Sequence, residues 1–92
     1  MKVTDIPAVA DYAHAQNPGC LVIVDNAFAT PLLVQPLKLG ADVVVHSATK
    51  YLNGHGDVVA GFSLARKAIM DKIRMVGLKD ITGAALGPQE AF

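Results

Sequence analysis

Apolar residues follow a helical spacing in the first part of the chain. Intervals of three and four residues, typical of one helix face, connect Ile6, Val9, Ala10 and Ala13. Thr4 or Asp5 can cap the start of this helix, and Pro7 is tolerated in its first turn. The turn-forming residues at 17–19, Asn-Pro-Gly, end it. The pattern therefore predicts a first helix that ends before residue 17.

Three later runs, rich in β-branched residues, have the length of strands. They are CLVIV (20–24), VVV (43–45) and VVAGFSL (58–64). A short helix over 32–38, interrupted or bent at Pro36, is expected between the first two runs. A helix over 66–76, closed by Gly77 and followed by the polar turn LKDITG, is expected after the third. This order predicts an α/β fold whose first two strands are parallel, joined by a right-handed crossover.

The apolar content is high for so short a chain. Of the 92 residues, 52% are hydrophobic and 17% are charged. A chain of this length buries only about 60–65% of its unfolded surface when it folds alone, and runs such as LVIV and DVVV need cover on both faces. We therefore expect residues 1–92 to be one partial domain, without an internal boundary, of a larger layered fold.

Charge and cysteine content narrow the class of protein. The formal net charge is zero, which argues against nucleic acid or an anionic membrane as a partner. No apolar run approaches the roughly 20 residues of a membrane span, and residues 1–19 lack the apolar core of a secretory signal. The one cysteine, Cys20, has no internal disulfide partner and is expected to be a small buried hydrophobe. These features favour a cytoplasmic protein.

A polar segment, HSATKYLNGHGD (46–57), separates two of the apolar runs. If the strands at 20–24 and 43–45 are parallel, Asp25 and the segment from Ser47 to Lys50 leave the sheet at one edge. Ligands of open α/β sheets bind at this edge, beyond the carboxyl ends of the strands. One rim is then expected to hold a carboxylate, two hydroxyl groups and an amine.

These groups suit an aldehyde cofactor that carries a phosphate. A lysine amine condenses with the aldehyde, a carboxylate keeps a ring nitrogen protonated, and hydroxyl groups bond to the phosphate, as in pyridoxal phosphate chemistry. The residues by themselves leave a second interpretation open. Because loops are commonly polar, Asp25 can equally cap a turn and Lys50 can be a solvated surface residue.

The other polar residues favour packing and turn formation. His46, His55 and Asp57 lack the close ligand spacing of zinc sites, so no metal is expected. The sequence GHG lacks the Lys and Ser or Thr of a phosphate-binding loop, and its glycines are expected to form tight turns. Tyr51 is expected to pack against neighbours, and His14 is expected to face solvent.

Residues 24–61 resemble the cofactor-lysine region of the Cys/Met-metabolism family of pyridoxal-phosphate enzymes, with VDN, GAD, HS-TKY and GHGD in register. The resemblance implies part of the large cofactor-binding domain of an aspartate-aminotransferase-like (fold type I) enzyme, a mostly parallel sheet flanked by helices. It implies that Lys50 is the catalytic Schiff-base lysine and that Asp25 pairs with the pyridine nitrogen. It also implies that Ser47 and Thr49 hold the phosphate.

The segment VGLKDITGAALGP (76–88) resembles methionine γ-lyases more than the other members of the family. The resemblance implies that Lys79 and Asp80 help to shape the substrate site of a carbon–sulfur lyase, in a homotetramer built from dimers. Two positions depart from the usual pattern: Ala27 stands where most relatives have Thr, and Gly87 where Ser is more usual.

Two alternatives remain beside γ-elimination. Within the family, the alternative is a cystathionine γ-synthase or lyase or an O-acylhomoserine sulfhydrylase. From a different class, the chain is an inactive fragment whose only property is packing or oligomer contacts. Neither the ring-stacking aromatic residue, nor the phosphate-cradling glycine turn, nor the substrate-binding arginine of the family is found in the 92 residues. We therefore expect the isolated chain to be inactive.

Overall fold

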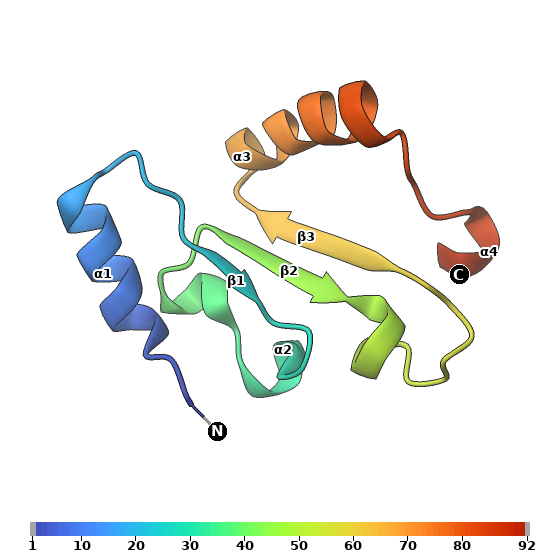
Figure 1. Ribbon diagram of the computed structural model, residues 1–92, viewed down its shortest axis with the longest axis horizontal. Helices are drawn as coiled ribbons and strands as arrows, with labels where there is room; N and C mark the ends of the chain where they lie inside the picture. The colour runs from blue at the N-terminus through green and yellow to red at the C-terminus, as the bar shows by residue number, and fades with distance from the viewer. Residues whose placement is uncertain (1, 92) are drawn as a thin grey trace.

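The computed structural model describes residues 2–91 and contains one three-stranded sheet, in the order β1-β2-β3 (Figure 1). β1 is Ile23–Asp25, β2 is Val43–Ser47 and β3 is Gly61–Ala65. β1 runs parallel to β2, which confirms the predicted parallel pair. β3 returns antiparallel to β2, so the part of the sheet described here is mixed, with helices flanking it.

Helix α1 (Ile6–Gln16) confirms the first predicted helix. The side chain of Asp5 caps its start by accepting a hydrogen bond from the Ala8 backbone N–H at 3.1 Å. Ala10 is buried on the inner side of the helix, close to Gly40. Gly40 has a φ of +98°, and a Cβ there would approach the Ala10 Cβ to 3.1 Å. The close approach and the left-handed backbone both require glycine at this position.

The connection from β1 to β2 contains two short helical pieces, so the helix predicted over 32–38 is interrupted just before Pro36 and begins two residues earlier. They are α2 (Thr30–Leu33) and the 3-10 helix η1 (Pro36–Leu39). Between them, Gln35 has φ −118° and ψ 80°, outside the helical region. The physical reason is Pro36, whose ring disfavours helical backbone at the residue before it.

The polar segment after β2 is more regular than a loop. Residues Ala48–Leu52 form η2, a single π-helical turn, directly after Ser47. The third strand starts at Gly61 rather than at residue 58, and Val59 ahead of it is 89% exposed. The strand prediction thus held for the second half of the run 58–64 only.

The last long helix does not end where it was predicted. α3 (Lys67–Lys72) continues directly into η3 (Ile73–Thr82), so Gly77 lies inside the helical segment and LKDIT is helical rather than a turn. An interior glycine costs a helix only about 1 kcal/mol, which neighbouring turns can offset. Gly83, with a φ of +60°, is the residue that ends it. The part of the chain after Gly83, for which the sequence pattern predicts no element, contains α4 (Pro88–Ala91).

The two faces of the sheet are covered by different elements. Val44 and His46 of β2 line a hollow with residues of α2–η1 on one face, whereas Val43 on the other face borders a hollow shared with α3. Cover is incomplete among residues 2–91: Ile23 is 62% and Val45 40% exposed. Incomplete cover agrees with strands whose sequence suits burial on both faces. No helix in residues 2–91 is long and apolar enough to cross a membrane.

Candidate cofactor site at the carboxyl edge of the sheet

The register of β1 and β2 places Asp25 and Ser47 on the same face of the sheet. Asp25 pairs with Val45, and paired residues of neighbouring strands share a face. Ser47 lies two residues beyond Val45, so it points to that face as well. Both residues end their strands at the carboxyl edge, and Lys50 follows in η2. The structure thus brings to one edge the strand ends that carry the predicted carboxylate and hydroxyl and the turn that carries the predicted amine. Figure 1 shows β1 and β2 ending at this same edge.

The Asp25 carboxylate is exposed and held by backbone. Its Oδ1 accepts a hydrogen bond from the Ala27 N–H at 2.9 Å, whereas Oδ2 has no hydrogen-bond partner among residues 2–91. Asn26, which is 4% exposed, anchors the turn: its N–H donates to the Val45 carbonyl and its Nδ2 to the Val34 carbonyl, both at 2.9 Å. Because the backbone of residue 27 holds the carboxylate, Ala27 in place of Thr leaves this contact intact.

Lys50 is exposed in η2 with a backbone that departs from the helical turn around it. Its φ is −89° and its ψ is −122°, so the chain changes direction at this residue. The Lys50 carbonyl accepts a hydrogen bond from the Gly54 N–H at 2.8 Å. Its amine has no ion pair among the described residues, where the three ion pairs involve other side chains. The Lys50 backbone is therefore fixed while its amine is available.

The two predicted phosphate ligands differ in what their hydroxyl groups already do. The Thr49 hydroxyl accepts a hydrogen bond from the Ala60 N–H at 2.8 Å and donates to the Ala60 carbonyl at 3.1 Å. A hydroxyl has a single proton to donate, so Thr49 here ties η2 to the segment that leads into β3. Ser47 is half-buried and makes no side-chain hydrogen bond within residues 2–91. Ser47 is thus the hydroxyl that is free to bind a ligand.

The residues after η2 close a turn on themselves. Asn53 Nδ2 donates to Asp57 Oδ1 at 2.7 Å, and His55 Nδ1 lies 2.6 Å from the Asn53 carbonyl. The pKa of Asp57 is lowered, first by the Asn53 hydrogen bond and then by its own backbone N–H. Gly54 and Gly56 have φ values of +73° and +72°, as their predicted role in tight turns requires. Residues 2–91 contain no group of three His, Cys, Asp or Glu side chains arranged to hold a metal ion.

Lys79 and Asp80, the predicted substrate-site residues, are adjacent on η3, far along the chain from Lys50, and both are exposed. Among the described residues, no hydrogen bond or ion pair links either of them to Asp25, Ser47 or Lys50. The structure of residues 2–91 therefore brings the predicted cofactor residues to one edge of the sheet, and no hydrogen bond or ion pair links the predicted substrate-site residues to them.

Two aromatic contacts lie near this edge, and the sequence pattern predicts neither pair of partners. The rings of Phe28 and Tyr51 lie 6.0 Å apart between centroids, tilted by 57°. Tyr51 packs as predicted, but its partner follows Asp25 by three residues and carries no signal of its own in the sequence. A third residue, His46, is 2% exposed and stacks on Phe62, with its Nδ1 buried and unpaired within residues 2–91.

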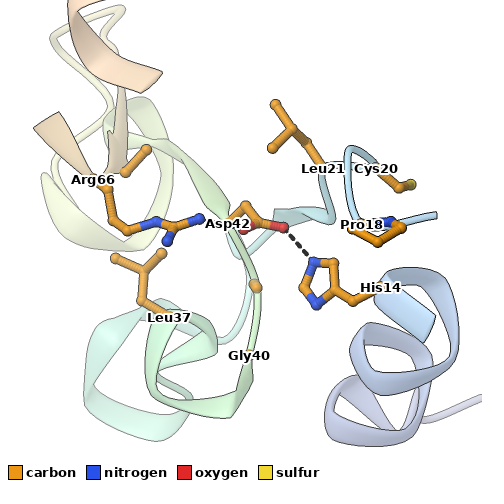
Figure 2. Close-up of a pocket in the computed structure, with 10 residues that line it drawn as sticks. His14, Pro18, Cys20, Leu21, Leu37, Gly40, Asp42 and Arg66 are labelled. Atoms are coloured by element: carbon orange, nitrogen blue, oxygen red, sulfur yellow. Dashed lines mark hydrogen bonds and ion pairs between the residues drawn. The ribbon is translucent and has the colours of Figure 1, made fainter. Parts of the chain in front are cut away.

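The opposite, amino edge of the sheet holds a second acidic residue in a different setting (Figure 2). Asp42, 8% exposed, accepts hydrogen bonds from the Val22 N–H at 2.9 Å, from His14 Nε2 at 2.7 Å and from Arg66 at 3.2 Å. The Val22 and His14 hydrogen bonds, with the nearby Arg66 charge, lower the pKa of Asp42 despite its burial. The prediction that His14 faces solvent is wrong, because its ring turns inward to this carboxylate. Cys20, predicted to be buried, is half-buried and lines the same hollow.

The sequence matches a known protein family along its whole length. The sequence pattern described as "Cys/Met metabolism PLP-dependent enzyme" matches residues 1–92. The chain belongs to this family. It is 63% identical over 92 residues to an L-methionine gamma-lyase of Fusobacterium nucleatum, and spans about a quarter (23%) of that relative.

Solved structures agree on the fold. CalE6, a methionine gamma lyase from Micromonospora echinospora, matches 99% of this chain with a TM-score of 0.88 and 38% identity. Cystathionine gamma-lyase from yeast matches 99% with a TM-score of 0.89 and 42% identity. The chain covers 24% and 23% of those two proteins, respectively. The predicted family and fold class are confirmed, and the segment is part of a fold type I cofactor domain.

Members of this family depend on pyridoxal phosphate, and the residues at the carboxyl edge fit it. The cofactor needs an amine for its aldehyde, a carboxylate for its ring nitrogen and hydrogen-bond donors for its phosphate. An unpaired lysine, an aspartate with a free oxygen and an unengaged serine hydroxyl stand at this edge, at Lys50, Asp25 and Ser47.

Proposed function

We propose that the protein containing these residues is a pyridoxal-phosphate-dependent carbon–sulfur lyase that eliminates the γ-substituent of methionine. The products are methanethiol, ammonia and 2-oxobutanoate. The observation that carries the proposal is the placement of Asp25 and the Lys50 turn at one edge of two parallel strands, with one Asp25 oxygen and the Lys50 amine unpaired within residues 2–91. The 63% identity to an L-methionine gamma-lyase supports methionine as the substrate.

The residues divide the work as follows. When bound, pyridoxal phosphate supplies an aldehyde and a ring that withdraws electrons. The free oxygen of Asp25 would hold a proton on the ring nitrogen, because a carboxylate stabilises a neighbouring positive charge. Lys50 would hold the cofactor at its aldehyde, and its amine would carry a proton at Nζ to and from the substrate carbon. Ser47 and Thr49 would bind the phosphate, Thr49 by turning its proton away from Ala60.

Lys79 and Asp80 shape the substrate side of the site. Both are exposed in η3 and so are free to contact a substrate or another part of the longer protein. We place the protein in the cytoplasm, since Cys20 is the one cysteine of these 92 residues and has no disulfide partner among them. Its assembly is a homotetramer built from dimers, which sedimentation of the full-length protein would measure.

The test is thiol release by the full-length protein from methionine alone. Thiol and 2-oxo acid should appear in equal amounts without any thiol acceptor or added nucleophile, and Lys50→Ala should abolish both. The alternative within the family is γ-replacement by a cystathionine γ-synthase or a homoserine sulfhydrylase. Product that forms only from an activated homoserine and an added thiol would establish it and overturn the elimination proposal.

The isolated 92-residue chain should bind the cofactor weakly and turn over no substrate, because it provides only one wall of the site. Equilibrium dialysis against pyridoxal phosphate, together with an assay of thiol release, checks this. Substantial lyase activity from the isolated chain would contradict it.

A further inference from the structure

Two exposed aromatic side chains join the two turns that carry the site. Phe28 follows Asp25 by three residues, and Tyr51 follows Lys50 directly. Their rings lie 6.0 Å apart between centroids and are tilted by 57°, a favourable aromatic geometry. Phe28 is nonetheless 78% and Tyr51 64% exposed. Within residues 2–91, this pair is therefore not part of a buried core.

The strand ladder positions only part of the site. Hydrogen bonds between β1 and β2 set Asp25 relative to Ser47, but Lys50 lies beyond the last ladder pair. The hydrogen bonds that hold the Lys50 turn lead elsewhere: Thr49 bonds to Ala60, and the Lys50 carbonyl to Gly54. Among residues 2–91, no hydrogen bond joins the segment 25–30 to the segment 48–54. The Phe28–Tyr51 contact bridges these two segments.

We infer that Phe28 and Tyr51 are positioning residues that set the separation between the Asp25 carboxylate and the Lys50 amine. This inference rests on the proposed function, in which both groups must reach opposite parts of one ring. The contact acts through the rings: Tyr51 makes no hydrogen bond through its hydroxyl within the described residues. Losing either ring frees the Lys50 turn to move relative to Asp25, which misplaces the amine without removing it.

The test compares variants of the full-length holoenzyme. Phe28→Ala and Tyr51→Ala should each raise the cofactor dissociation constant by about three- to tenfold, the range expected of one aromatic contact. They should also shift the midpoint pH of the bound cofactor's visible absorption and lower kcat more than they raise KM. The double variant should be no worse than either single one, because both remove the same contact. Tyr51→Phe, which keeps the ring, should match the wild type.

Two further variants control for stability and side-chain size. Tyr12→Ala removes a tyrosine on α1 that is 69% exposed and should leave cofactor binding and the pH midpoint unchanged. Phe28→Leu keeps an apolar side chain but loses the ring contact, and it should behave like Phe28→Ala. Thermal unfolding of each full-length variant checks that its stability is that of the wild type.

Several outcomes would overturn the inference. Tyr51→Phe failing as badly as Tyr51→Ala would assign the effect to the hydroxyl, and additive losses in the double variant would show two unconnected residues. If the wild type shows the cofactor absorbance and the single variants match it in cofactor affinity, pH midpoint and kcat, the positioning role is refuted and the proposed function stands. A wild-type protein without that absorbance would refute the proposed function and this inference with it.

Discussion

The two edges of the sheet each hold an aspartate, and the two carboxylates are treated in opposite ways. At the amino edge, Asp42 is 8% exposed and accepts hydrogen bonds from a backbone N–H, a histidine and an arginine. At the carboxyl edge, Asp25 is exposed and accepts one hydrogen bond from the backbone, with its second oxygen free. The amino edge satisfies its own charge, and the carboxyl edge leaves charge available for a ligand.

The difference separates stability from chemistry. A buried, fully bonded carboxylate stabilises the fold and resists change, because removing it strands its partners. An exposed carboxylate with a free oxygen contributes little to stability but can pair with a ligand cation. Variants at the amino edge should therefore change unfolding, and variants at the carboxyl edge should change cofactor chemistry.

The largest effect is expected at Lys50. In the full-length protein, Lys50→Ala should remove the visible absorption of the bound cofactor and lower kcat by at least about 10²–10⁴-fold, the usual contribution of one acid–base group. Lys38→Ala, which removes an exposed lysine on η1, is the matched control and should leave both unchanged. Survival of the yellow chromophore in Lys50→Ala would refute the assignment.

Asp25 should come next. Asp25→Asn should lower kcat/KM by about 10²-fold, since an amide cannot neutralise the ring-nitrogen cation. The melting temperature of the apoprotein should stay within about 1–2 °C of the wild type, because surface substitutions seldom change stability by more than about 0.5 kcal/mol. Asp11→Asn, another exposed acid, serves as the control. A large drop in melting temperature with activity intact would reverse the roles of the two edges.

Asp42→Ala should show the opposite behaviour. It leaves the Val22 N–H, His14 and Arg66 without their shared acceptor, and should lower the free energy of unfolding by about 2–3 kcal/mol. Cofactor absorbance per folded molecule should be retained. Denaturant unfolding of the full-length apoprotein measures the free energy of unfolding, and an absorption spectrum of the holoenzyme measures the cofactor absorbance. Lost absorbance at unchanged stability would contradict the comparison.

The stability that Asp42 contributes should depend on pH in a defined direction. Its pKa is lowered in the folded state from the ordinary value of 3.8, so the folded protein binds this proton less readily than the unfolded chain. The contribution is complete above pH 3.8 and is lost as the pH falls from 3.8 toward the lowered value. The difference in unfolding free energy between wild type and Asp42→Asn should be constant from pH 7 to 5 and shrink below about pH 4. A difference that grows on acidification would be inconsistent with the lowered pKa.

The smallest effect is expected at Arg66, whose side chain is 78% exposed and lies 3.2 Å from Asp42. Arg66→Ala should reduce the unfolding free energy by no more than about 1 kcal/mol, as for other solvent-screened pairs. High salt should reduce the difference further. A loss as large as that of Asp42→Ala would mean that the ion pair, rather than the Val22 and His14 hydrogen bonds, holds this edge.

Local signals in the sequence predicted the elements that depend on local physics. The cap at Asp5 lies where α1 begins, and the β-branched run before Asp25 leads to the end of β1. The polar break after Val45 does not end β2, which continues to Ser47 because it pairs with β3 up to that residue. Gly77 misled, because a glycine stops a helix only where the backbone turns left-handed, and that happens at Gly83. For the site residues, spacing left two interpretations open, and only the resemblance to the family predicted a specific role for each residue.

Long-range contacts were beyond the sequence pattern. His14 meets Asp42 across 28 positions, and nothing in the helical spacing around His14 indicates an inward ring. Phe28 and Tyr51 meet only because β1 and β2 are adjacent and parallel, so the segments that follow them leave the sheet at the same edge. Such partners are set by topology, so they become visible only once the strands are paired.

The most direct test of the central claim is chemical mapping of the cofactor lysine. The full-length holoenzyme is reduced with borohydride, digested and analysed by mass spectrometry for the added pyridoxyl phosphate mass. The account predicts that this mass is found on Lys50, within the peptide that contains SATKYL. Its recovery on Lys79, Lys38 or any other lysine, with Lys50 unmodified, would contradict the account.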